Sequence, residues 1–130
     1  MRLRLPIALA CAFLVHAADW KPADNPLTTP WTEKVSPANA LPEYPRPQMM
    51  RARWTNLNGL WDYAITAKDA ARPEQFEGKL LVPYPVESAL SGVKRALKPD
   101  QRLWYRRALN VAAPTNSRLL LNFGAVDGRA

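Results

Sequence analysis

Cysteine and histidine are almost absent from this 130-residue sequence, in which each occurs once, as Cys11 and His16. Both stand in the first 17 residues, which we expect to be cleaved. The mature chain would then lack both residue types, which excludes a Ser-His-Asp triad, a Cys-His pair and a zinc site built from them. It would also lack disulfides, so the fold depends on its core. We expect no metal and no other cofactor.

The expectation of cleavage comes from the layout of the N-terminus. Arg2 and Arg4 precede a short apolar run at 5–15, and small residues follow it, as in a secretory signal peptide. The run is shorter than the roughly 20 residues that cross a bilayer. Cleavage is therefore favoured over an uncleaved anchor or a lipid attached at Cys11. We expect a secreted or periplasmic protein that is not held in a membrane.

Charge of either sign is modest in the mature chain. Without the two signal arginines it has 16 basic and 11 acidic residues, a net charge of +5, with the basic residues scattered from Lys21 to Arg129. Scattered charge of this size on an exported chain does not favour nucleic acid as a partner. About 113 residues suffice for one domain with a sizeable core.

Prolines divide the mature chain into two parts. Seven of the 13 prolines lie between Pro22 and Pro47, a density that excludes helix. We expect residues 18–50 to form an extended arm across the surface, held there by Trp31 and Tyr44. Residues 51–130 would form the domain itself.

Short runs of strand-forming residues, separated by turns, indicate an all-β sandwich or barrel. We expect strands at 60–65, 79–82, 103–111 and 118–123, a turn at Asn58-Gly59, and a loop with one helical turn at 64–77. Four strands leave the sheets incomplete, and nothing covers the last one. We interpret the chain as the beginning of a larger protein; the alternative is a small domain that dimerises through its open edge.

No two carboxylates have a spacing that guarantees the separation glycoside hydrolysis requires. Glu87 is the best placed, in the loop VPYPVESALSG at 82–92. It could accept backbone N–H groups of the Ser88–Gly92 turn, pair with Arg106, or line a site. A single carboxylate without a partner performs little general acid–base catalysis, so we predict no catalytic residue in this chain.

The run RLWYRR at 102–107 combines arginines with two aromatic residues. Strand alternation places Trp104 and Arg106 on one face and Tyr105 on the other. One of the two aromatic residues is then ordinary core, and the other could stack on a sugar. Asp127 follows an apolar run, and its simplest role is to stabilise a turn.

Four motifs together give this sequence a family resemblance: TNLNGLWDY, LVPYPVESALSGV, RLWYRRALNV and LLLNFGAVD. In order and spacing they resemble the N-terminal sugar-binding domain of glycoside hydrolase family 2, which contains β-galactosidases, β-glucuronidases and β-mannosidases. The resemblance covers residues 54–127. Gly128 stands where the family has an aromatic residue.

The resemblance implies a galactose-binding-like jelly-roll β-sandwich, incomplete at its C-terminus. It also implies downstream immunoglobulin-like and TIM-barrel domains, the barrel carrying both catalytic glutamates. The chain would supply a scaffold and one wall of a carbohydrate site, for which we name Glu87, Trp104, Arg106 and Asp127. The alternative is a non-catalytic carbohydrate-binding module that acts alone, with an exposed Trp104 as its platform.

Overall fold

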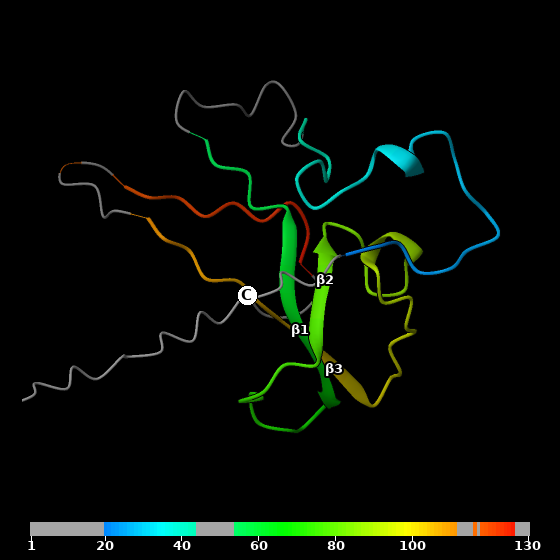
Figure 1. The fold of residues 1–130 in the computed structure, drawn as a ribbon. Coiled ribbons are helices and arrows are strands. Elements are labelled where there is room, and N and C mark those ends of the chain that lie inside the picture. Colours follow the sequence, from blue (N-terminus) through cyan, green and yellow to red (C-terminus); the bar gives the residue numbers. More distant parts are fainter. Residues whose placement is uncertain (1–19, 44–53, 112–115, 117, 127–130) are drawn as a thin grey trace, which may run out of the picture.

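A computed structural model describes residues 20–43, 54–111, 116 and 118–126 of the chain. Its centre is one antiparallel sheet of three strands, β1 (Gly59–Ala67), β2 (Gly78–Val82) and β3 (Gln101–Arg106) (Figure 1). Two short 3₁₀ turns accompany it, η1 (Thr32–Lys34) and η3 (Ala89–Ser91). The described residues are mainly β with little helix, so the all-β class is confirmed at this level.

The longest strand lies in the middle of the sheet, in the order β2-β1-β3. The N-terminal half of β1 pairs with β2, from Gly59 opposite Val82 to Tyr63 opposite Gly78. The C-terminal half pairs with β3, from Asp62 opposite Arg106 to Ala67 opposite Gln101. The two registers overlap only at residues 62 and 63, so Asp62 has a paired residue on both sides.

Alternation along the strands gives the sheet two chemically different faces. One face is largely apolar and aromatic. It carries Trp61, Tyr63, Ile65, Leu80, Leu103 and Tyr105. The other, which we call the polar face, carries Asp62, Thr66, Lys79, Arg102, Trp104 and Arg106, together with Ala64 and Leu81. The polar face concentrates ionic side chains at cross-strand positions, where opposite charges attract.

The buried core is small for a chain of this length. Among the described residues it consists of Ala40, Ala64, Leu80, Leu81 and Val86, with Ser91 as the buried polar residue. Leu80 and Leu81 are both fully buried although they point to opposite faces, so β2 is covered on both sides. The sheet therefore relies on the η3 loop, which packs against β2, and this loop is in turn bound by the N-terminal arm.

The loop after β2 is held by its own serines. Ser88 Oγ accepts from the backbone N–H of Leu90 at 3.2 Å and so caps η3. Buried Ser91 donates from Oγ to the carbonyl of Ser88 at 2.7 Å and accepts from the N–H of Val93 at 3.0 Å. Gly92 ends η3 in the left-handed conformation, φ 84°, which favours glycine. These local bonds fix how the chain leaves the loop.

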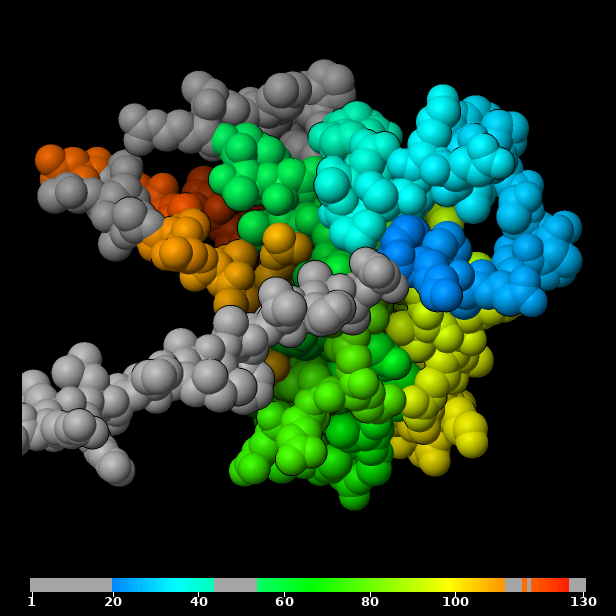
Figure 2. All heavy atoms as spheres, viewed as in Figure 1, coloured from blue at the N-terminus to red at the C-terminus, as the bar shows by residue number. Residues whose placement is uncertain are grey.

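The N-terminal arm, residues 20–43, has little regular structure and loops out from the body between its two attachments (blue to cyan in Figure 2). Trp20 Nε1 donates to the carbonyl of Ser91 at 3.3 Å, and the N–H of Ala23 donates to that of Ala89 at 2.9 Å. Farther along, Asn58 Nδ2 donates to the carbonyl of Ala40 at 2.9 Å. The arm is thus fastened at both ends, by the η3 loop and by the approach to β1.

Three details of the predicted arm and turns are wrong. Trp31 is 70% exposed and does not hold the arm, while Tyr44 lies outside the described residues. Asn58 and Gly59 form no turn; the Asn58 side chain binds the arm instead, and buried Gly59 begins β1. The described segment 64–77 contains no helical turn, because β1 continues to Ala67.

The predicted strands near the C-terminus also differ from the structure. β3 ends at Arg106, so the strand expected over 103–111 stops early, and described residues 118–126 form no strand. Residues 107–111 lead away from the sheet, and residues 118–126 run back towards it (orange to red in Figure 1). The apolar side chains of 118–126 are exposed, including Leu120 at 71%. The three strands agree with an all-β protein, whereas the jelly-roll sandwich stays a prediction. Within the described ranges, no helix has the length and apolar character to cross a membrane.

Candidate functional site

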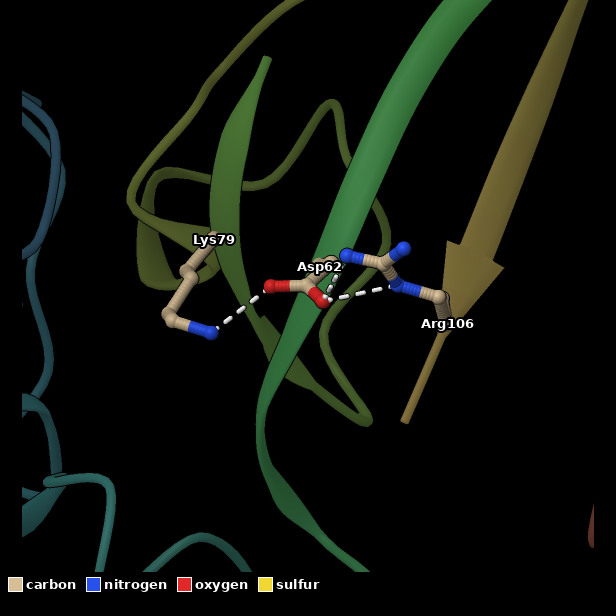
Figure 3. A network of polar contacts seen from close by, with 3 residues as sticks. All are labelled: Asp62, Lys79 and Arg106. Atoms are coloured by element: carbon tan, nitrogen blue, oxygen red, sulfur yellow. Dashed lines mark hydrogen bonds and ion pairs between the residues drawn. The ribbon is translucent and has the colours of Figure 1, made fainter. Parts of the chain in front are cut away.

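Asp62 stands at the centre of the polar face, between two cations from the flanking strands. Lys79 Nζ on β2 donates to Oδ1 at 2.7 Å, and Arg106 Nε on β3 donates to Oδ2 at 3.0 Å, with Arg106 Nη2 forming an ion pair with the same oxygen at 2.9 Å (Figure 3). Both carboxylate oxygens are therefore occupied, one by each neighbouring strand. The side chain of Asp62 is 24% exposed, and its two partners are about half exposed.

The two cations determine the protonation of Asp62. The hydrogen bond from Lys79 lowers the pKa of the Asp62 carboxyl most, burial opposes it, and the bond from Arg106 lowers the pKa further. The carboxylate, which is already ionised near neutrality at its ordinary pKa of 3.8, therefore stays ionised to a lower pH. A group held ionised in this way serves poorly as a general acid, which must carry a proton at the working pH.

An aromatic ring extends this cluster. The guanidinium carbon of Arg106 lies 4.0 Å from the ring centroid of Phe76, within the range of a cation–π contact. Phe76 borders an open groove of about 600 Å³, whose other lining residues are Asp62, Glu74, Gln75, Gly78, Lys79 and Arg106. The groove is shallow and joins charged groups of both signs to one aromatic ring.

Trp104 lies on the same face as Arg106, as the alternation in RLWYRR predicts. Its indole Nε1 donates to Thr66 Oγ1 at 2.9 Å, and the Arg102 guanidinium carbon lies 5.5 Å from the ring centroid. Trp104 is half-buried, so the prediction of an exposed platform is wrong. Its neighbour Tyr105, on the other face, is 45% exposed.

Glu87 is exposed and, among the described residues, makes no hydrogen bond or ion pair. Both anchoring roles predicted for it are wrong, since Ser88 and Ser91 bind the N–H groups of the turn and Arg106 binds Asp62. Burial raises the pKa of the Tyr105 phenol, and the charge of Glu87 adds to this increase. Glu87 is thus near Tyr105 on the face opposite to Arg106. The prediction that it lines a site stays a prediction.

The structure brings together only two of the four predicted site residues, Trp104 and Arg106, which share the polar face. Asp127 lies outside the described residues. Asp62, Phe76 and Lys79 were missed as site residues. The alternating pattern of LWDYAI places Asp62 away from the apolar face, but the partners of Asp62 depend on which strands flank β1 and in which register, and no pattern in the sequence gives these.

Glu77 was also missed, because its polar surroundings suggested an exposed loop. Its Oε1 accepts from the backbone N–H of Ile65 at 2.7 Å, and its Oε2 accepts from Arg95 Nη1 at 2.8 Å. The carboxylate therefore replaces the next ladder bond of β1 just before β2 begins. This acid has a structural role.

No group of three or more Cys, His, Asp or Glu residues in the described part of the chain has the arrangement of a metal site. Every buried side-chain nitrogen or oxygen in those residues has a hydrogen-bond partner. No model of a known protein family matches the sequence, and no curated protein matches it.

Proposed function

We propose that this chain is the sugar-binding scaffold domain of an exported glycoside hydrolase of family 2, which acts on O-glycosidic bonds in carbohydrate metabolism. The supporting observation is the arrangement of the motifs that carry the resemblance. TNLNGLWDY runs into β1, LVPYPVESALSGV contains the end of β2 and all of η3, and RLWYRRALNV contains most of β3. Segments distant in sequence thus meet on three hydrogen-bonded strands.

The carboxylates of the sheet favour a scaffold over a catalytic domain. Asp62 is held ionised by Lys79 and Arg106, and Glu77 binds a backbone N–H and Arg95. A retaining glycosidase needs two carboxyl groups about 5 Å apart, of which one carries a proton. Neither acid is free for that chemistry. In this proposal both catalytic glutamates belong to a downstream TIM barrel, which comes after an immunoglobulin-like domain.

The groove at Phe76 and Arg106 favours a second candidate function, a carbohydrate-binding module that acts without a catalytic partner. The two functions share a carbohydrate ligand and differ in whether catalytic domains continue the chain. We consider the hydrolase the better conclusion because four ordered motifs support it, whereas the module rests on one groove.

Two measurements test the proposal. The reading frame downstream of the Ala130 codon should encode a barrel with two glutamates, and a stop codon without one would leave only the module. The 130-residue chain itself should not turn over chromogenic β-glycosides. Turnover by the purified chain would contradict the assignment of a non-catalytic role.

A further inference from the structure

The groove on the polar face presents unused donors and acceptors next to one another. Among the described residues, Lys79 uses one of its three N–H groups and Arg106 uses one of its five, both on Asp62. The carboxylate of Asp62 has about four lone-pair sites, of which these two hydrogen bonds occupy two. Free N–H groups of Lys79 on β2 and Arg106 on β3 therefore remain available on either side of the Asp62 carboxylate. The same two side chains hold that carboxylate in position.

Among the described residues that line the groove, the charges cancel. Asp62 and Glu74 contribute two negative charges, and Lys79 and Arg106 contribute two positive charges. An anionic or cationic ligand would bring a charge for which this neutral set has no counter-charge. A neutral polar ligand brings no charge and needs none. The remaining lining consists of Gly78, the Gln75 amide, which donates and accepts, and the Phe76 ring.

We infer that this groove binds a pair of adjacent hydroxyl groups of an uncharged sugar, with Asp62 as acceptor and Lys79 and Arg106 as donors. Each hydroxyl donates one hydrogen bond and accepts others, so two neighbouring hydroxyls match an acceptor flanked by donors. The bonds formed are charge-assisted, and the cross-strand ion pairs hold their partners in place. The Phe76 edge of the groove provides apolar contact for the sugar ring. The inference rests on the proposed sugar-binding function and specifies where and what the domain binds.

The position of this site differs from that of the loop containing Glu87. Glu87 is associated with Tyr105 on the opposite face, whereas Glu74 lines the groove. Both are exposed glutamates without a hydrogen bond or ion pair among the described residues. The same substitution, Glu to Gln, can therefore be made at Glu74 inside the site and at Glu87 outside it, as a matched pair.

The test is a titration of the full chain, followed by two-dimensional NMR, with methyl β-D-galactoside, methyl β-D-glucoside and sodium D-glucuronate. We expect saturable shifts with at least one neutral glycoside and weaker binding of glucuronate. Lys79→Gln, at a half-exposed position, should lower the affinity for the neutral glycoside by about tenfold, as expected for the loss of a charge-assisted hydrogen bond. Asp62→Asn should lower this affinity at least as much. If Asp62→Asn does not fold, Lys79→Gln still tests the inference.

The glutamate pair tests the charge argument. Glu74→Gln leaves the groove with a net positive charge and should shift the preference towards glucuronate by about threefold. Glu87→Gln should change neither affinity. If the neutral glycoside binds equally well to the wild type, Lys79→Gln and Glu74→Gln, the inference is overturned while the proposed function stands. Binding of none of the three sugars would overturn both, and a wild-type preference for glucuronate would overturn the neutral-ligand assignment alone.

Discussion

The Glu77 carboxylate and the backbone N–H of Ile65, 2.7 Å apart, form a hydrogen bond where the strand ladder between β1 and β2 has ended. The N–H of Glu77 also donates to the carbonyl of Tyr63 at 2.9 Å. Main chain and side chain of one residue thus satisfy two backbone groups of β1 beyond the ladder. Arg95 binds the other carboxylate oxygen and joins the segment after η3 to the same point.

Removal of the Glu77 side chain should therefore destabilise the sheet. Glu77→Ala leaves the Ile65 N–H without its partner and breaks the bond to Arg95, for an expected loss of about 1–3 kcal/mol in the free energy of unfolding. Urea unfolding followed by tryptophan fluorescence measures it. Glu77→Gln keeps an acceptor for the Ile65 N–H, so its free energy of unfolding should fall by less. Glu74→Ala is the matched control, and an equal loss there would show that the Glu77 contacts contribute nothing specific.

Gly92 and Trp20 test how the N-terminal arm is attached. A Cβ at Gly92 would lie 2.8 Å from Trp20 Nε1, and the residue has φ +84°. Gly92→Ala should therefore both strain the backbone and displace the indole, with a cost of about 1–3 kcal/mol. Thermal melts of Gly92→Ala, Trp20→Ala and the double variant separate the two causes. The double variant should lose less than the sum of the single losses, and strict additivity would contradict the contact.

Acid should weaken the fold through Asp62. The pKa of its carboxyl is lowered from the ordinary 3.8 in the folded chain, mainly by Lys79. The stabilisation is thus complete above about pH 4 and is lost as the pH falls through the lower folded value. Since the pairs are partly exposed, the change should be about 1 kcal/mol or less. Comparison of wild type and Asp62→Asn by urea unfolding from about pH 6 to about pH 2 isolates it; parallel curves would refute the assignment.

The exposed leucines beyond β3 should govern self-association more than stability. Leu119, Leu120 and Leu121 are consecutive apolar residues that are 55–71% exposed, and exposed apolar groups favour association. Leu120→Lys should leave the melting temperature within about 2 °C of wild type, since an exposed position contributes little to stability. It should also reduce concentration-dependent light scattering. Leu80→Ala, at a fully buried position, is the contrasting variant and should lower the melting temperature strongly.

The sequence predicted most of the sheet correctly because its strands have strong local patterns. The alternation around Trp61 and Tyr63 indicates β1, and the apolar run ended by Pro83 indicates β2. The run at 118–123 has the same apolar character but no strand in the structure. A strand forms only where another strand satisfies its backbone groups, and composition does not show whether that neighbour is present.

The site was less predictable than the fold. Arg106 and Trp104 were correctly placed on one face, since the two-residue period alone decides that. Glu87 attracted attention because of its rigid loop, yet the serines hold that loop. Asp62 and Lys79 are 17 positions apart in the chain, and Asp62 and Arg106 are 44 apart. Such partners depend on strand order.

The sequence by itself determined the β character and the alternation that separates an apolar from a polar face, because both depend on local backbone preferences. Only the tertiary structure decided that β1 lies between β2 and β3 in a register that sets Asp62 opposite both Lys79 and Arg106. Register depends on packing between distant segments, and a shift of one residue would move Asp62 to the other face. The groove therefore depends on the pairing of three strands, which the sequence of any one strand does not determine.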